Sequence, residues 1–222
     1  MVKTAILVDG GFFLKRYNKL VANGSKHDGV EKADFLYEKI MNHLNNKGDL
    51  YRVLYYDCKP FEGKAHNPIT GKPINFAITP QNKARKEFFE CLKKKRKVAL
   101  RLGELATTGD WLISAHLTKD LIKGKIAVSD LTERQVSFDI RQKKVDIKIG
   151  LDIASLAYKG NIEKIILISG DSDFVPAAKL ARREGIDFIL DPMWQNVEES
   201  LHEHIDGLHS VFPKPRGFKS KY

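Results

Sequence analysis

Four aspartates lie at the ends of predicted strands or at the start of a predicted helix, where side chains can form an active site. Asp9 ends one short apolar run, Asp171 and Asp173 follow another, and Asp146 opens a predicted helix. If the apolar runs are parallel strands, these acids meet at one edge of the sheet, where ligand sites of such sheets lie. Two like charges 4 Å apart repel by about 4 kcal/mol at an effective dielectric constant of 20. A group of this kind therefore predicts a bound cation.

Carboxylate oxygens are hard ligands, so Mg²⁺ or Mn²⁺ is the expected cation. A divalent cation lowers the pKa of a bound water and neutralises charge on a phosphate. The expected chemistry is hydrolysis of a phosphodiester bond. The expected catalytic and metal-ligating residues are Asp9, Asp146, Asp171 and Asp173.

Each of these acids also has a purely structural alternative. Asp9 and Asp173 precede predicted helices, where an aspartate side chain can cap backbone N–H groups. Asp171 lies in a Gly-Asp turn, where aspartate is common, and Asp146 has lysine neighbours for a surface ion pair. Asp152 lies about 120° away from Asp146 around a helix, so it ranks lower as a ligand.

The net charge of +10 is concentrated in two segments. Residues 81–101 hold nine Lys or Arg residues against two Glu, and residues 212–222 hold four with no acid. Such segments predict a polyanionic partner, because neutralising phosphates releases counterions. The alternative is a solvated helix face with a loose tail. The residues expected to bind nucleic acid are Lys83, Arg85, Lys86, Lys93, Lys94, Lys95, Arg96, Lys97, Lys144 and Lys148.

The elements that must position these residues follow from apolar periodicity. Strands are predicted over residues 3–8, 51–56, 98–102, 136–140, 163–168 and 186–190. Helices are predicted over 12–22, 32–46, 81–95, 111–121, 145–158, 174–183 and 194–205. This alternation predicts an α/β fold, a doubly wound, mostly parallel sheet with helices on both faces. We expect one domain over residues 1–211, with a surface loop at 59–80, a helical insertion at 104–134 and a basic tail at 212–222.

Composition excludes several classes of protein. The longest clean apolar runs are four to five residues, whereas a membrane helix needs about 20, so no membrane span or membrane partner is expected. Cys58 and Cys91 stand too far apart in sequence to suggest a thiolate zinc site, and a reducing cytoplasm is the expected location. No Walker A, G-x-S-x-G or G-x-G-x-x-G pattern occurs.

Three blocks of sequence resemble the NYN domain family of the PIN-like nucleases, and most of all its LabA-like branch. They are Ile6–Phe12 (Ile-Leu-Val-Asp-Gly-Gly-Phe), Lys143–Lys148 and Leu167–Pro176 (Leu-Ile-Ser-Gly-Asp-Ser-Asp-Phe-Val-Pro), in matching order and spacing. The resemblance implies the PIN-like fold and metal-dependent cleavage of RNA in an acidic pocket. The family's acids fall on Asp9, Asp146, Asp171 and Asp173, and Asp152 matches a further acid.

The resemblance has two limits. Phe12 stands where many members of the family have asparagine. Residues 59–80, 104–134 and the tail have no counterpart in the three blocks.

The leading hypothesis is a Mg²⁺- or Mn²⁺-dependent endoribonuclease, with RNA as partner and single-stranded DNA as an alternative. The second hypothesis is a non-catalytic RNA- or DNA-binding module that uses the basic segments. A Toprim-type enzyme would need glutamate where Asp9 stands, and a haloacid-dehalogenase-like phosphatase would need aspartate at Gly11. The formation of a homo-oligomer stays open.

Overall fold

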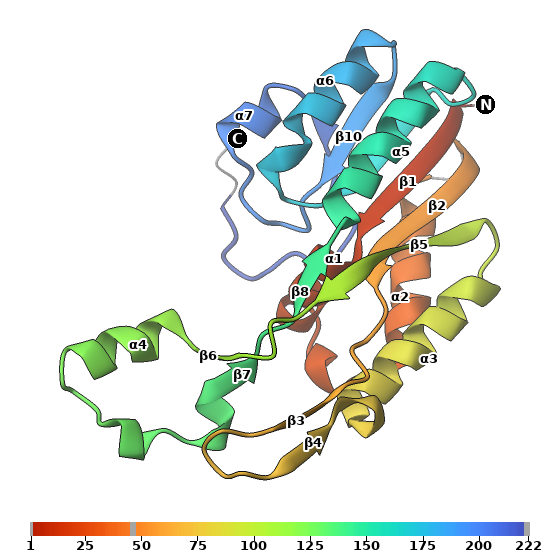
Figure 1. Cartoon of the computed structure of the whole chain (residues 1–222). Helices are drawn as coiled ribbons and strands as arrows, with labels where there is room; N and C mark the ends of the chain where they lie inside the picture. Colours follow the sequence, from red (N-terminus) through yellow and green to blue (C-terminus); the bar gives the residue numbers. More distant parts are fainter. Residues whose placement is uncertain (1, 45–47, 220–222) are drawn as a thin grey trace.

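The computed structural model describes residues 2–44 and 48–219, and within them a seven-stranded sheet forms the centre of the molecule (Figure 1). The strand order is β11-β10-β9-β1-β2-β5-β8, and all neighbours are parallel except β5 and β8. The strands are β1 (Val2–Asp9), β2 (Gly48–Cys58), β5 (Val98–Ala106), β8 (Arg141–Lys143), β9 (Lys164–Ile168), β10 (Asp187–Asp191) and β11 (Gly207–Leu208). The predicted mostly parallel α/β sheet is confirmed.

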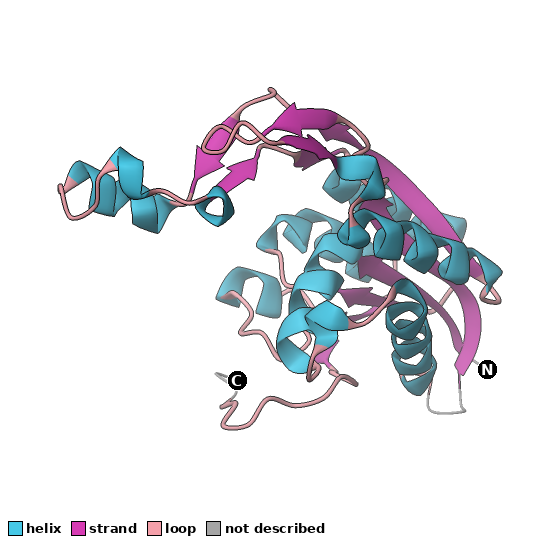
Figure 2. Ribbon diagram, turned by 90° about the horizontal axis from the view of Figure 1, so that it is seen from below, coloured by secondary structure: helices cyan, strands magenta, loops and turns pink. Residues whose placement is uncertain are grey.

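Helices cover both faces of this sheet (Figure 2). On one face lie α1 (Gly10–Leu20), α2 (Gly29–Asn42) and α3 (Pro80–Lys94), and on the other α5 (Val145–Lys159), α6 (Val175–Arg183) and α7 (Glu199–His202). Successive residues of β1 serve opposite faces, with Leu7 in one core and Ile6 and Val8 in the other. Strands buried on both faces read as continuous apolar runs, which is why β1 and β9 are visible in the sequence.

Two predicted helices are wrong in part. Residues 111–113 form strand β6 (Trp111–Ile113), which pairs antiparallel with β7 (Val136–Phe138), and helix α4 covers only Ala115–Ile122. The predicted helix over 194–205 does not begin at Trp194, because Met193 and Trp194 adopt left-handed backbones (φ 45° and 60°) that a helix does not accommodate, and only α7 is helical within that span. The end of the predicted helix over 32–46 falls partly outside the described residues.

The two segments outside the sheet pack together as one substructure, here called the arm (residues 60–79 and 107–140). It contains the hairpin of β3 (Lys64–His66) and β4 (Pro73–Asn75) as well as β6, α4 and β7. The rings of Phe61, Phe76 and Phe138 lie with centroids 5.3 to 5.5 Å apart, and Trp111 lies 5.5 Å from Phe138. Figures 1 and 2 both show the arm projecting from the sheet beyond the ends of β2 and β5.

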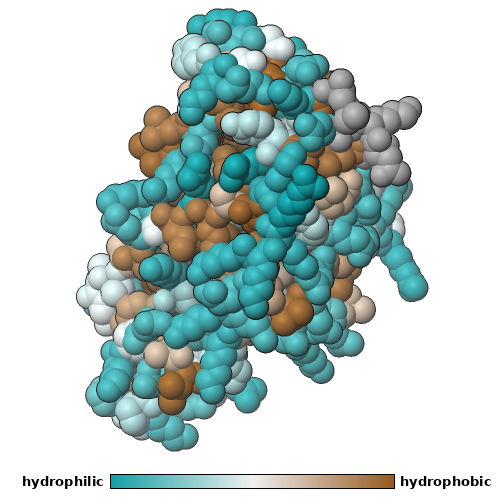
Figure 3. All heavy atoms as spheres, turned by 90° about the vertical axis from the view of Figure 1, so that its right-hand side faces the viewer, coloured by the Kyte–Doolittle hydropathy of each residue, from teal (hydrophilic) through white to brown (hydrophobic). Residues whose placement is uncertain are grey.

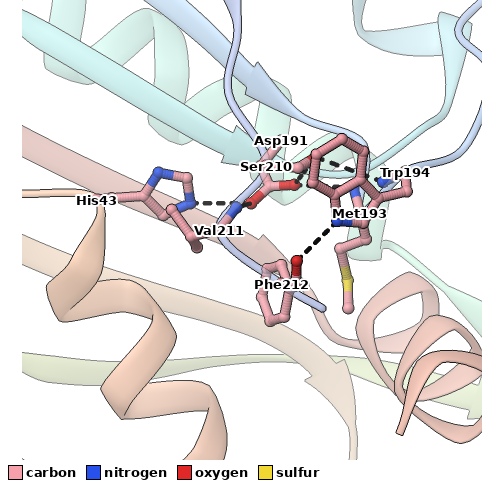
Figure 4. Close-up of polar contacts among 7 residues, drawn as sticks. All are labelled: His43, Asp191, Met193, Trp194, Ser210, Val211 and Phe212. Atoms are coloured by element: carbon pink, nitrogen blue, oxygen red, sulfur yellow. Dashed lines mark hydrogen bonds and ion pairs between the residues drawn. The ribbon is translucent and has the colours of Figure 1, made fainter. Parts of the chain in front are cut away.

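The segment after β10 is held by a buried carboxylate (Figure 4). Asp191 accepts a hydrogen bond from Ser210 Oγ at 2.7 Å and contacts His43 Nε2 at 2.9 Å, and the side chains of His43 and Asp191 are fully buried. Because Ser210 and His43 both contact Asp191 rather than each other, this is no nucleophilic triad. The predicted tail begins in the core, since Phe212 is buried and its carbonyl accepts a hydrogen bond from Trp194 Nε1 at 2.7 Å.

Within the described residues, no helix is both long enough and apolar enough to cross a membrane.

Candidate metal centre

The predicted acids follow strands that lie side by side. β1 and β9 pair in parallel with Val8 opposite Ile168, so Asp9 and Asp171 leave the sheet at the same edge. Asp171 lies in the turn after β9, and its carboxylate accepts a hydrogen bond from Asp173 N at 3.0 Å. The carboxyl ends of β1 and β9 therefore hold three of the four acids.

Asp146 reaches the same edge from a helix. It is the second residue of α5, which packs over β1, β2 and β5. Burial raises its pKa, and the charges of Asp171 and Asp173 raise it further. Asp146 thus lies within electrostatic range of the acids that follow β9.

Asp9 is the most buried member of the group. Burial raises its pKa from 3.8 to about 6, the Phe12 N–H opposes the rise, and the charges of Asp146 and Asp57 add to it. Its carboxylate accepts a hydrogen bond from Phe12 N at 3.0 Å and one from Ser169 Oγ at 3.4 Å. These hydrogen bonds do not offset the cost of its negative charge.

The group lacks a cation of its own. In the described part of the chain, none of the four aspartates forms an ion pair. Nor do three His, Cys, Asp or Glu side chains among those residues come close enough to form a ready-made metal cluster. This donor set fits Mg²⁺, which binds through one or two carboxylates and keeps several waters, better than a cation that needs a closed protein cage.

The structural alternatives hold for two of the four acids. Asp9 caps α1 through its hydrogen bond with Phe12 N, and Asp171 caps the 3₁₀ turn Ser172–Phe174. Asp173 caps no helix, since α6 starts without a side-chain cap. Capping uses only part of a carboxylate, so Asp9 and Asp171 keep oxygen lone pairs for a second role.

Asp152 is engaged elsewhere. Its carboxylate accepts hydrogen bonds from Tyr56 Oη at 2.9 Å and from Arg101 Nε at 3.1 Å. The structure therefore separates Asp152 from the group, in agreement with its position around the helix.

Asp57 is an important acid that the sequence reasoning did not single out. It lies near the carboxyl end of β2, next to β1, and is fully buried. Tyr55 Oη and Gln142 Nε2 donate to it at 3.1 and 2.9 Å, and Arg85 forms an ion pair with it. The rule that selects Asp9, an acid at the end of a predicted strand, also selects Asp57. Its burial and its partners are not visible in the sequence.

The residues predicted to bind nucleic acid lie at opposite edges of the sheet. Helix α3 begins near Asp57 and ends near the start of β2, where Lys97 Nζ contacts Asp49 Oδ1 at 3.1 Å. At 1.5 Å per residue, Lys93 lies about 12 Å from Arg85 along the helix axis. The carboxyl edge holds Lys83, Arg85, Lys86, Lys144 and Lys148, and the opposite edge holds Lys93, Lys94, Lys95, Arg96 and Lys97.

Several of these cations have acidic neighbours. Ion pairs join Lys86 to Glu62, Lys93 to Glu90, Lys95 to Asp34 and Lys144 to Glu104. Exposed pairs of this kind contribute only about 0–1 kcal/mol, so a phosphate can compete for them. The side of the molecule on which α3 lies is mostly hydrophilic, with apolar atoms gathered in separate patches (Figure 3).

Comparisons with known proteins agree with this architecture. The model of the NYN domain matches residues 3–205. An uncharacterized protein of Methanocaldococcus jannaschii is 24% identical over 146 residues, which are 64% of this chain and 58% of that protein. The chain thus spans less than two thirds of that curated relative. The crystal structure of a protein of unknown function from Vibrio parahaemolyticus has the same fold, with a TM-score of 0.51, 16% identity and 95% of each chain covered.

Proposed function

The chain belongs to the NYN domain family, and from this premise we propose that it is a divalent-metal-dependent ribonuclease. The observation that carries the proposal is the group of acids at the carboxyl edge. Asp146 raises the pKa of Asp9, and Asp171 and Asp173 raise that of Asp146. Among the described residues, none of the four acids has an ion-pair partner. A nuclease-like fold supports the proposal. Within the family, the LabA-like branch remains our prediction.

In this proposal, Asp9, Asp146 and Asp171 hold Mg²⁺ or Mn²⁺, one or two of them directly and the rest through water. When bound, the cation supplies a water of lowered pKa and neutralises charge on the phosphate. Asp173 is a further ligand or orients a water. Lys144 and Lys148, which flank Asp146 in sequence, hold the RNA backbone next to the acids.

Buried neighbours fix the position of the strand end. Gly10 follows Asp9, and a Cβ on Gly10 would lie 2.5 Å from Asp57 Oδ2. Asp57 is in turn fixed by Arg85 and Gln142 from two other elements. A carboxylate held in this way needs little reorganisation when it binds a ligand.

Labelled single-stranded RNA, incubated with increasing Mg²⁺ or Mn²⁺, tests the proposal. We expect the wild-type protein to cut the RNA and Asp171→Asn to lose at least about 10²-fold in rate, the scale on which one electrostatic group contributes to catalysis. Asp187→Asn is the matched control, because Asp187 is paired with Lys164 at the opposite end of β10. Cleavage that survives in Asp171→Asn would assign the activity to a contaminant or to another site.

Measuring RNA binding in the same samples distinguishes a ribonuclease from the second candidate function, a non-catalytic binding module. Binding of RNA without cleavage in either metal would favour the binding module, in which the basic residues act alone. Phe12 would then be the first residue to change, since it occupies the position of the family's asparagine. Single-stranded DNA in parallel tubes would show whether the sugar is discriminated.

A further inference from the structure

A cavity of about 620 Å³ lies between α1 and α3, on the face of the sheet that these helices cover. It is enclosed by α1, by the chain between α1 and α2, and by the first turns of α3. Cavities of about 300–1,000 Å³ are typical of small-molecule sites. The volume is therefore suited to one nucleotide.

One wall of the cavity is cationic. Lys26, Lys32 and Arg85 line it. Lys32 is half-buried, and its Nζ donates to the His27 carbonyl at 2.7 Å. In the described part of the chain no carboxylate lies within ion-pair distance of Lys32. A half-buried ammonium group whose hydrogen-bond partner among the described residues is a single carbonyl is suited to bind an anion.

The acid in the cavity wall is already used. Asp28 caps α2, accepting a hydrogen bond from Glu31 N at 2.9 Å, and the Glu31 side chain accepts one from Asp28 N at 2.9 Å. Burial lowers the pKa of Lys32, while Asp28 and Glu31 oppose that shift. The cost of burying the Lys32 charge is thus not fully offset by its neighbours.

The rest of the lining suits a nucleobase. Leu14 and Ala84 supply apolar surface, while Asn18, Ser25 and Gln81 supply hydrogen-bonding groups. Recognition of RNA bases commonly combines contact on the flat face with hydrogen bonds to the edge. A base can enter such a cavity only when it is unpaired.

The cavity is connected to the acids through two elements. Helix α1 starts directly after Asp9, so Leu14 and Asn18 lie about 6 and 12 Å from its first residue along the axis. Arg85 lines the cavity and also pairs with Asp57, and a Cβ on Gly10, the residue after Asp9, would lie 2.5 Å from Asp57 Oδ2. The cavity and Asp9 are therefore connected by α1 and by the ion pair of Arg85 with Asp57.

We propose that this cavity is a nucleotide subsite for single-stranded RNA. It holds one nucleotide next to the scissile phosphate, with a phosphate on Lys32 and Lys26 and the base against Leu14 and Ala84. The identity of the ligand as RNA rests on the proposed function, whereas the position of the subsite rests on the cavity lining and on the Lys32 ammonium group.

Binding of fluorescein-labelled single-stranded RNA to Asp171→Asn protein tests the subsite without any need for cleavage. Adding Lys32→Gln should weaken binding about tenfold and reduce the slope of log affinity against log salt by about 0.7. Lys32→Arg keeps the charge and should bind within about twofold of the parent. Lys179→Gln, on the exposed side of α6, is the matched control and should also bind within about twofold of the parent.

A second readout does not depend on the variants. Adenosine 5′-monophosphate added to ¹⁵N-labelled wild-type protein should shift the side-chain amide signals of Asn18 and Gln81. Equal affinities for Lys32→Gln and Lys179→Gln, or unchanged amide signals, would overturn the subsite. Absence of cleavage by the wild-type protein would overturn the nuclease proposal and leave this binding test intact.

Discussion

The guanidinium of Arg85 forms an ion pair with the carboxylate of Asp57, which is fully buried behind the candidate metal centre. The contact joins α3 to the end of β2, and Gln142 Nε2 adds β8 to the same carboxylate at 2.9 Å. Arg85 therefore stabilises the fold, whereas the sequence predicts it only as an RNA-binding residue. Its neighbour Lys86 pairs with Glu62, its one ion-pair partner among the described residues, and both side chains are exposed.

Arg85→Ala should lower the free energy of unfolding by about 2–3 kcal/mol, because it leaves the Asp57 charge buried without its cation. This value lies below the full range for buried pairs, since the Arg85 side chain is 23% exposed. Lys86→Ala should change stability by no more than about 0.5 kcal/mol. Urea unfolding of both variants measures the difference, and equal midpoints would show that Asp57 does not depend on Arg85.

Gly10→Ala should lower the free energy of unfolding, whereas Gly11→Ala should leave it nearly unchanged. A Cβ on Gly10 would lie 2.5 Å from Asp57 Oδ2 and 2.5 Å from Tyr55 Oη, both in the buried core. Overpacking of this kind costs about 1–3 kcal/mol. At Gly11 the nearest atom is Gln142 Oε1 at 3.2 Å, the end of a flexible side chain.

Thermal unfolding of the two glycine variants provides the measurement. Alanine gains up to about 1 kcal/mol over glycine in helices, so Gly11→Ala should be close to neutral or slightly stabilising. If Gly10→Ala unfolds at the same temperature as Gly11→Ala, the close packing of Gly10 on Asp57 is not a feature of the folded protein.

The sequence predicts the sheet well because its central strands are buried on both faces. Ala5–Val8 are fully buried and apolar, and the run Ile165–Ile168 is nearly so. The pattern needs no long-range information. The arm is different, since its small core of Phe61, Phe76 and Phe138 joins segments more than 60 residues apart in sequence. The periodicity of apolar residues within one segment cannot predict a contact between two distant segments.

Sequence spacing cannot distinguish the acids at the strand ends, for a related reason. Asp9, Asp57 and Asp191 all lie at or near carboxyl ends of parallel strands, so spacing alone treats them alike. The structure distinguishes them by their partners: Asp57 has Arg85, and Asp191 has His43 and Ser210. Those partners come from distant parts of the chain.

Asp9→Asn should stabilise the protein at neutral pH when EDTA is present. The folded-state pKa of Asp9 is raised to about 6 from its ordinary value of 3.8, so the folded state binds more protons between these values. The free energy of unfolding of the wild-type protein therefore falls as pH rises from about 4 to about 6. Asparagine removes this loss and still accepts a hydrogen bond from Phe12 N, so the gain at pH 7 should be about 1–2 kcal/mol.

Urea unfolding from pH 4 to pH 8 measures the effect of Asp9→Asn. The difference between variant and wild type should be near zero at pH 4 and largest above pH 6. Asp187→Asn, which removes an exposed carboxylate paired with Lys164, is the control for replacing a surface aspartate. A difference between Asp9→Asn and wild type that does not change with pH would contradict the raised pKa.

Mg²⁺ or Mn²⁺ should raise the melting temperature of the wild-type protein, because a cation that binds only the folded state stabilises it. At about 100 times the dissociation constant the gain is about 2.7 kcal/mol, and each kcal/mol is worth about 2–4 °C in a chain of this size. Asp146→Asn should lose most of the rise, since Asp146 lies within range of both Asp171 and Asp173. NaCl at equal ionic strength separates binding from screening. If Asp146→Asn gains as much as the wild-type protein does from Mg²⁺, the cation binds elsewhere and the candidate metal centre is misplaced.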